Sequence, residues 1–443
     1  MNRYETYKEI DIPWLKKVPK HWEVNKVKTY GVVKKELNKN NVEKNVLSLT
    51  YGGVIKNDIN NPNGLVPASY ETYQKFCRND LVFKLIDLEN IKTSRVGIVP
   101  EDGIMSSAYI RLKLNDNFIS RYGYYYFYKL YIEEVYNNLG AGVRSTMSGS
   151  DLKNMEICIP PLNEQEKIVN YLDWKINEID KLISIEKKKI KLLQIYREET
   201  VFHNILKNKS IIPEEFKLEG VRKYATFIRG AASFTKDDLL NSGDYVALQY
   251  GKVYKVDIVN EDYNFYVNHE FYKASQVVNK GDILAVYTSE TIDDLGHFAF
   301  YEKEEKGLIG GEQILIKVLE TINPKYLFYA LKSRSIELKR SATGIKVYRF
   351  KINDLKAIKI PVPSLKVQEK IVQEIENSLM LITERLKNSE LKINGLEALK
   401  QSLIAEVVTG QIDVRNVVIP AYEKVDSVVD EEIEGEELLE DGD

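Results

Sequence analysis

Two glycine-containing loops carry the residues best suited in this sequence to bind an anionic ligand. The first, GAGVRSTMSGSDL, spans residues 140–152, and the second, ATGIKVYRFKINDL, spans residues 342–355. Each places a basic side chain, Arg144 or Lys346, two residues after a glycine. Glycine lets a backbone approach a partner closely, and basic and hydroxyl side chains suit phosphates and base edges. An ordinary solvated loop is the alternative interpretation.

Two further pairs of stretches resemble each other. The turn YGGVIKN (residues 51–57) has a probable counterpart in QYGKVYK (residues 249–255). GIMSSAYIRL (residues 103–112) matches LIGGEQILIK (residues 308–317), with polar residues where each strand is expected to begin. A glycine-rich turn alone is weak support for a ligand site, but its recurrence makes these turns candidate contacts.

Signatures of catalysis are missing from the sequence. It contains no GxxxxGK[ST] phosphate loop and no glycine fingerprint for a dinucleotide. Two cysteines and four histidines offer little material for a disulfide framework or a zinc site. No carboxylate cluster recurs in both halves, which argues against a metal-dependent nuclease. We therefore expect no catalytic residue, no metal and no cofactor.

The matched stretches belong to a long internal repeat. IPPLNEQEKIVNYL begins at residue 159 and VPSLKVQEKIVQEI at residue 362, so Gln165 aligns with Gln368 at an offset of 203. The offset falls to 202 and then 194 towards the start of each copy. Such drift is typical of loop insertions and deletions. The chain is thus predicted to hold two diverged copies of one globular segment followed by one long helix.

The two predicted helices carry matching heptad seams, which predicts that they pack on each other as an antiparallel coiled coil, with surface helices on separate domains as the alternative. A polar residue interrupts each seam at the same place, Glu186 in the first copy and Ser389 in the second, and should fix the register. At 1.5 Å per residue, about 45 residues span about 65 Å. The seam residues are Leu172, Ile176, Ile179, Ile183, Ile190, Leu193, Ile375, Leu379, Ile382, Leu386, Ile393 and Leu396.

The globular segments are predicted to be mixed α/β, which makes the fold class α+β. Short strands are expected in KNVLSLTYGGVIK, DLVFKLI, SRVGIV and AYIRLKL, and also where the two DLK stretches begin, at Asp151 and Asp354. The tyrosine run of residues 122–136 could stack on unpaired bases. However, Leu327 and Leu331 replace Tyr124 and Tyr128 in the second copy, so we expect this run to pack in a core.

Charge is distributed unevenly along the chain, whose net charge is −3. Residues 421–443 hold eleven Asp/Glu and one Lys, a net of −10, which leaves 62 Lys+Arg against 55 Asp+Glu, or +7, in the rest. The tail is either a solvated end or a decoy that competes with a polyanion. No membrane span and no signal sequence is expected, and the cytoplasm is the default compartment.

The repeated helix start resembles a known family. A globular segment that ends in a strand, continues as IPPLNEQEKIV or VPSLKVQEKIV, and leads into a long helix is similar to the specificity subunit of type I restriction–modification enzymes. VPKHWEVNKVK at residues 18–28 and LIAEVVTGQIDV at residues 403–414 also look like that family. The likeness covers about residues 10–415. The tail has no place in the family's pattern.

The resemblance implies target-recognition domains at residues 1–160 and 209–361, spacer helices at 161–208 and 362–412, and an unstructured acidic tail at 413–443. It implies a chain without catalytic activity that reads a bipartite, asymmetric double-stranded DNA target. Its partners would be two DNA methyltransferase subunits and motor–nuclease subunits. The candidate DNA contacts are Tyr51, Lys56, Arg95, Ser107, Arg144, Ser145, Thr146, Ser148, Gln249, Tyr250, Lys252, Thr288, Lys346, Tyr348, Arg349 and Lys351.

Two other function classes remain open from sequence. A coiled-coil adaptor that holds two protein-binding domains would share the paired helices, the modest positive charge and the acidic tail. A nuclease that acts alone would need catalytic residues that the two copies do not share.

Overall fold

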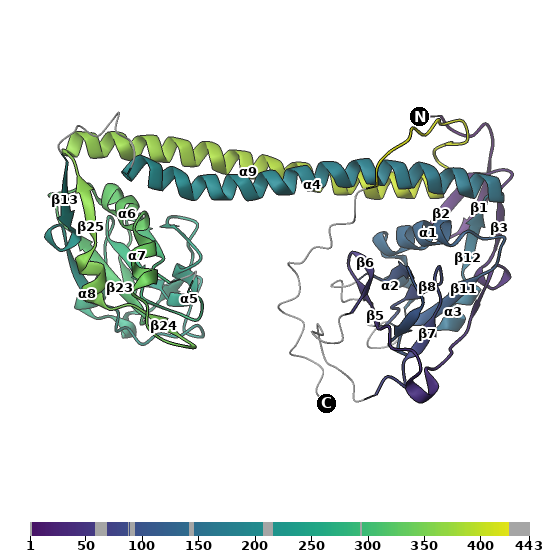
Figure 1. The fold of residues 1–443 in the computed structure, drawn as a ribbon, viewed down its shortest axis with the longest axis horizontal. Coiled ribbons are helices and arrows are strands. Elements are labelled where there is room, and N and C mark those ends of the chain that lie inside the picture. The colour runs from purple at the N-terminus through teal and green to yellow at the C-terminus, as the bar shows by residue number, and fades with distance from the viewer. Residues whose placement is uncertain are drawn as a thin grey trace. The chain divides into compact units, whose positions relative to one another are not determined.

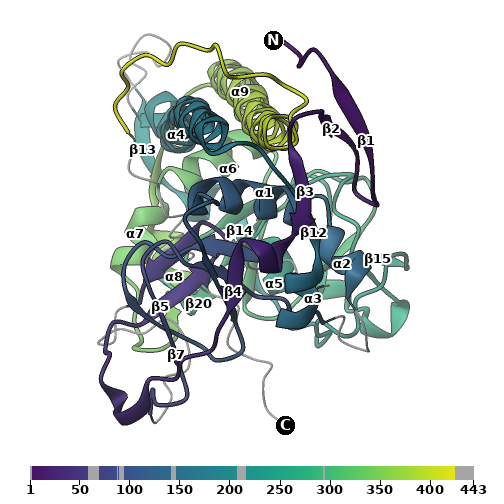
Figure 2. The ribbon, with the colours of Figure 1, turned by 90° about the vertical axis from the view of Figure 1, so that its right-hand side faces the viewer.

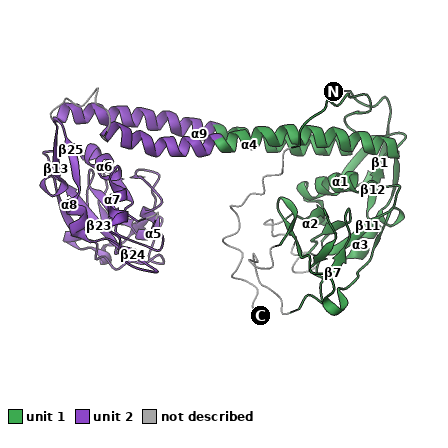
Figure 3. Cartoon of the chain, in the orientation of Figure 1, with its two compact units in different colours: residues 1–188, 389–443 green, residues 189–388 purple. Residues whose placement is uncertain are grey.

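The computed structural model describes residues 2–57, 69–86, 88, 94–140, 146–206, 216–292 and 295–424. The chain divides into two compact units, residues 1–188 with 389–443, and residues 189–388 (Figure 3). Each unit contains one half of each long helix, α4 (Leu162–Leu206) and α9 (Leu365–Val408). We call them unit 1 and unit 2.

Unit 1 is built around an antiparallel sheet with the strand order β4-β11-β8-β9. Its strands are β1 (Tyr7–Ile12), β2 (Leu15–Pro19), β3 (Glu23–Lys26), β4 (Gly31–Val33), β5 (Leu47–Thr50), β6 (Gly53–Lys56), β7 (Gln74–Phe76), β8 (Leu81–Phe83), β9 (Val96–Ile98), β10 (Gly103–Met105), β11 (Ile110–Leu114) and β12 (Glu156–Ile159). Its short helices are α1 (Ser120–Ile132), α2 (Val135–Leu139) and α3 (Gly149–Asn154).

Unit 2 has two larger sheets, with the orders β14-β23-β19-β21-β16 and β17-β15-β22-β18. Its strands are β13 (Lys217–Gly220), β14 (Ala225–Arg229), β15 (Tyr245–Leu248), β16 (Ile258–Val259), β17 (Tyr266–Val267), β18 (Val277–Val278), β19 (Ile283–Val286), β20 (Thr288–Ser289), β21 (Phe298–Tyr301), β22 (Gly307–Ile309), β23 (Gln313–Val318), β24 (Tyr348–Arg349) and β25 (Lys359–Val362). Its helices are α5 (Tyr250–Val253), α6 (Pro324–Lys332), α7 (Ser335–Arg340) and α8 (Ile352–Ala357).

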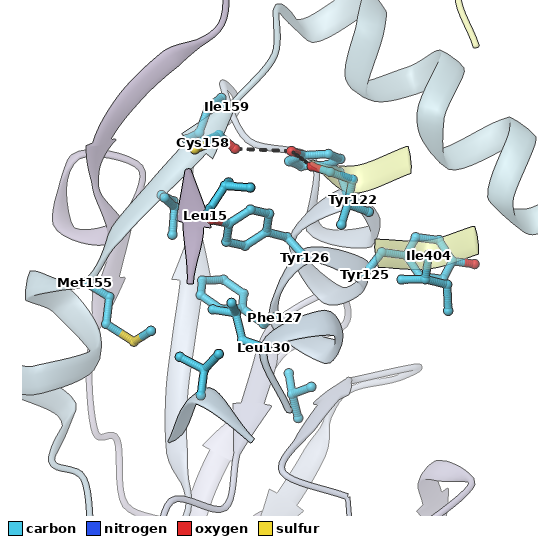
Figure 4. Packing of buried hydrophobic residues seen from close by; sticks show 14 of the residues in the cluster. Leu15, Tyr122, Tyr125, Tyr126, Phe127, Leu130, Met155, Cys158, Ile159 and Ile404 are labelled. Carbon is cyan, nitrogen blue, oxygen red and sulfur yellow. Dashed lines mark hydrogen bonds between the residues drawn. The ribbon is translucent and has the colours of Figure 1, made fainter. Parts of the chain in front are cut away.

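The tyrosine run lies in the core of unit 1, as predicted. Tyr122, Tyr125 and Tyr126 on α1 are buried and pack with residues from β12 and the end of α9 (Figure 4). The Tyr122 hydroxyl donates to the Cys158 carbonyl at 3.1 Å, so the ring is buried with its polar atom satisfied. In unit 2 the Tyr326 hydroxyl makes the same bond to the Pro361 carbonyl at 2.7 Å.

The glutamine that both copies share at the repeated helix start joins each long helix to its globular domain. Gln165 Oε1 accepts the backbone N–H of Ile119, just before α1, at 2.8 Å, and its Nε2 donates to the Pro160 carbonyl at 3.0 Å. Gln368 repeats both bonds, accepting from Asn323, just before α6, at 2.8 Å. Both side chains are buried, so they clamp the helix start to the domain and leave no polar group for chemistry.

An ion pair at matching positions reinforces this junction. In unit 1, Arg121 on α1 contacts Asp173 on α4 at 3.0 Å. In unit 2, Lys325 on α6 contacts Glu376 on α9 at 2.5 Å. Different residue types therefore preserve the same contact in the two copies. The internal repeat is therefore visible in the packing as well as in the amino-acid sequence.

The long helices lie side by side and run antiparallel (Figures 1 and 2). Within unit 1, Lys400 contacts Asp180 at 2.7 Å and Lys392 contacts Glu186 at 3.4 Å. Residue numbers therefore fall along α9 as they rise along α4, which makes the pair antiparallel. Every predicted seam residue is buried or half-buried, as a seam between packed helices requires. The boundary between the units falls at the polar interruption, beside Glu186 and the fully buried Ser389.

Two predictions about local structure are wrong. The DLK stretches form helices, α3 and α8, because Asp151 and Asp354 each cap a helix start by accepting a backbone N–H three residues earlier at 2.8 Å. The strands β12 and β25 begin only after them. QYGKVYK is also not a turn like YGGVIKN: the first copy forms the β5–β6 hairpin, whereas the second forms α5.

Candidate nucleic-acid interface

The glycine loop of unit 2 is a closed hairpin with a basic, exposed tip. Thr343 and Arg349 exchange two backbone hydrogen bonds, both of 2.9 Å, and so close the loop between them. Gly344 has φ +128, and a Cβ there would lie 1.9 Å from the Val347 carbonyl oxygen, so only glycine fits. We call residues 343–349 the 343–349 hairpin. Its conformation is set by its own backbone, which presents the tip in one shape.

The side chains of this hairpin combine charge with exposed apolar surface. Lys346 and Arg349 are exposed, and Ile345, directly before Lys346, is 93% exposed. Lys351 follows, exposed as well, at the start of α8. Cations at such positions can bind phosphates, and an aliphatic tip can contact the methyl group of thymine. The sequence singles out the cations but not Ile345, because an isolated isoleucine in a loop gives no signal of its exposure.

A short strand pair ties the hairpin to the sheet of unit 2. β24 pairs with β20, which places Arg349 opposite Thr288 and Tyr348 opposite Ser289. Arg229, at the end of β14, lies over the Tyr287 ring at 5.4 Å. The hairpin therefore pairs with β20, which follows the central strand β19, and lies near the end of the edge strand β14.

The stretch QYGKVYK (residues 249–255) begins next to a hydrogen bond with Gln313. The Gln313 side chain donates to the Leu248 carbonyl at 2.7 Å, directly before Gln249, and its backbone pairs with Val286 at the end of β19. Gln249 precedes α5, which carries the half-buried Tyr250 and Lys252. Lys252 lies 4.5 Å from the centre of the Phe265 ring, a cation–π contact.

Unit 1 presents fewer of its predicted contacts. Tyr51 is exposed at the turn of the β5–β6 hairpin, and Lys56 is exposed at the end of β6. Thr146 is exposed, and Ser107 is half-buried in the turn after β10. Arg144 and Ser145 lie outside the described residues.

Three candidate contacts are either buried or bonded within unit 1 or unit 2. Arg95 is 1% exposed, and its guanidinium donates to the Ile86 carbonyl at 3.2 Å. Thr288 is 7% exposed within the β20–β24 pair. Ser148 caps α3: its hydroxyl accepts the Asp151 N–H and donates to the Asp151 carboxylate at 2.7 Å, which lowers the pKa of that carboxyl. Arg95 and Thr288 are therefore no longer candidate contacts, because their side chains are buried and cannot reach a ligand.

Other site chemistry is not supported among the described residues. No group of three or more His, Cys, Asp or Glu side chains in that part of the chain is placed to hold a metal ion. Burial raises the pKa of the Cys158 thiol to about 12, so it is not an activated nucleophile. None of the helices in the described ranges is long and apolar enough to cross a membrane.

Comparison with known proteins reveals relatives with the same layout. The family model for the type I restriction modification DNA specificity domain matches twice, over residues 9–194 and 213–394. The type I restriction enzyme MjaVIII specificity subunit of Methanocaldococcus jannaschii is 25% identical over 342 residues, 71% of this chain and 75% of that protein. A candidate MjaX specificity subunit from the same organism is 26% identical over 287 residues, and the match covers 61% of this chain and 63% of that protein.

A solved structure shares the fold. A chain from a study of complex assembly and conformational transition in the type I R-M system superposes with a TM-score of 0.69. It is 14% identical in sequence, and the match covers 89% of this chain and 99% of that one. At this identity the likeness establishes the arrangement of the elements alone.

Proposed function

Because the chain belongs to the family of type I restriction modification DNA specificity domains, we propose that it reads a two-part DNA sequence for a type I restriction–modification complex. The observation that carries this proposal is the duplication of one recognition unit with diverged loops. The clamp of Gln165 and Gln368 is the same in both copies, while the loops that face outward differ. A protein that reads two different half-sites needs this combination of a common scaffold and unlike contact surfaces.

In this proposal residues 1–160 and 209–361 are the two recognition domains. The 343–349 hairpin of unit 2 contacts one half-site, with Lys346 and Arg349 on phosphates or base edges. The equivalent loop of unit 1, which includes Arg144, contacts the other. The paired helices α4 and α9 fix the number of base pairs between the half-sites.

The chain would supply specificity and a scaffold. Two methyltransferase subunits would modify an adenine in each half-site by rotating the base out of the duplex. Motor–nuclease subunits would join the same complex for cleavage. Exposed apolar residues on the long helices, such as Leu192 and Leu391, offer surface for such partners.

Variants of the two loops test the proposal. Purified complexes that carry Lys346→Ala or Arg349→Ala should lose affinity or discrimination in one half-site, and Arg144→Ala should affect the other half. A lysine that contacts one phosphate should also lower the slope of log affinity against log salt by about one. Mapping of modified adenines by long-read sequencing reports each half separately. Lys370→Ala, an exposed lysine on α9, is the matched control.

Three outcomes would contradict this assignment. Equal changes in both halves would show that the hairpin is not a half-site reader. A chain that binds no specific DNA with its methyltransferase subunits present would be a coiled-coil adaptor. Cleavage by the chain alone would make it a nuclease.

A further inference from the structure

A row of side chains faces outward on α4, away from the seam with α9. Asn177, Lys181, Ile185 and Lys188 follow one another at steps of four, four and three residues, which places them on one helix face. Ile185 is 59% exposed and Lys188 is exposed, whereas Asn177 and Lys181 are half-buried and Lys181 contacts Glu178 on the same helix at 3.4 Å. All four lie in unit 1. The row offers one apolar side chain between two cations, and we call it the α4 outer row.

The second copy of the repeat has no such row. At an offset of 203, Glu384 replaces Lys181, Asn388 replaces Ile185 and Leu391 replaces Lys188. Residues 181–191 contain five Lys and one Glu, a net of +4, whereas residues 384–394 contain three basic and two acidic residues, a net of +1. A ligand of the α4 outer row therefore meets its site once per chain. Two identical partner subunits, one on each copy of the repeat, could not both bind such a row.

The last described residues already run along this helix. A cavity of about 530 Å³ lies between them and α4, lined by Lys167 and Asn170 from the helix and by Arg415–Ile419 and Tyr422 from the segment. Val417 and Ile419 pack against the core of unit 1. Asn177, the first member of the row, donates from Nδ2 to the Glu423 carbonyl at 3.0 Å. The segment thus advances from Lys167 to Asn177 and reaches the start of the row.

We propose that residues 425–443 continue along α4 and dock on the α4 outer row. This segment contains ten Asp/Glu, no Lys or Arg, and six Val, Ile or Leu residues. Its carboxylates suit Lys181 and Lys188, and its apolar side chains suit Ile185. The tail and the row also agree in number, because each occurs once per chain. Exposed ion pairs are weak singly and screened by salt, so the contact should open as ionic strength rises.

Zero-length cross-linking of the full chain tests the proposal. A carbodiimide joins a lysine to a carboxylate only when they touch, and peptide mass spectrometry identifies the pair. We expect tail carboxylates joined to Lys181 or Lys188 at least threefold more often than to Lys387, an exposed lysine on α9. The yield should fall at least threefold in 0.5 M salt. Ile185→Ser should lower it at least twofold, whereas Met380→Ser, an exposed apolar residue on α9, should leave it unchanged.

A mixture of unlabelled and nitrogen-15-labelled chains identifies the occupant. Cross-links within one chain support the proposal, and cross-links only between a labelled and an unlabelled chain would assign the row to a second copy. Tail cross-links that fall mainly on other lysines, or no tail cross-links at all, would overturn it. So would an Ile185→Ser variant that keeps its tail cross-links and loses methyltransferase binding, because the row would then belong to that subunit.

Discussion

Gln165 and Gln368 show how a single side chain can determine where a domain ends and a helix begins. Each is buried and satisfies a backbone N–H at the start of a neighbouring helix. The sequence repeat marked these glutamines as important but did not reveal their role. Their partners lie 46 and 45 residues earlier in the chain, and no local pattern links them.

Removal of this clamp should destabilise each unit. Gln165→Ala and Gln368→Ala each leave a half-buried N–H and a proline carbonyl without this partner, which costs up to about 1–3 kcal/mol for each unsatisfied group. Urea denaturation followed by circular dichroism measures the loss. The exposed neighbours Glu166 and Glu369 provide controls, since their replacement by Ala should change stability by less than about 0.5 kcal/mol. Equal losses in all four variants would contradict the clamp.

A variant of Ser148 can separate a structural role of this residue from a contact with DNA. Ser148→Asp keeps an acceptor at the cap of α3 but adds a negative charge. If the residue serves only as a cap, DNA affinity should not change, although stability should fall because an aspartate cannot donate to the Asp151 carboxylate and repels it. If it faces a phosphate, affinity should drop several-fold, which filter binding at low salt would detect.

The same cap should respond to acid. The hydrogen bonds from Ser148 lower the pKa of Asp151 from its ordinary value of 3.8. A carboxyl with a depressed pKa stabilises the folded chain above its ordinary pKa and loses that contribution as the pH falls through the lowered value. Ser148→Ala should therefore reduce the loss of stability below about pH 4. A pH titration of the melting temperature that is identical for both proteins would contradict this.

At the scale of elements, the 343–349 hairpin depends on one glycine. Gly344→Ala would place a Cβ against the Val347 carbonyl and force an alanine into a left-handed backbone, so the tip must change shape. We expect reduced discrimination in one half-site with a melting temperature within a few degrees of the parent. Methylation mapping and calorimetry report the two effects separately. Gly311→Ala, where a Cβ meets nothing within 4 Å, is the matched control.

The sequence predicted periodic elements well and non-periodic ones poorly. The seam of α4 and α9 is visible because each residue type repeats at heptad spacing. The strand predicted at Asp151 is wrong. An aspartate followed by an apolar residue can open either a helix or a strand, and the sequence alone does not show that Asp151 caps a helix. Arg95, a candidate contact, is buried by the fold, and nothing in the stretch SRVGIV signals that burial.

At the scale of the whole molecule, charge limits how tightly the chain can bind DNA alone. Its body carries +7 and its last 23 residues carry −10. This modest positive charge predicts weak binding by the isolated chain, with a steep dependence on salt. Methyltransferase subunits would then supply much of the affinity, while this chain supplies the choice of sequence.

The paired helices should act as a ruler between half-sites. One heptad inserted beside Glu186 and one beside Ser389 would keep the antiparallel seam in register, because both helices grow by the same two turns. Seven residues add about 10 Å of helix, close to three base pairs at about 3.4 Å each. We expect the modified adenines, mapped by long-read sequencing, to move apart by that amount. An insertion in one helix alone should mismatch the seam and lower stability. If the doubly extended chain still methylates sites with the original gap, the helices do not set the spacing, and flexible loops must do so instead.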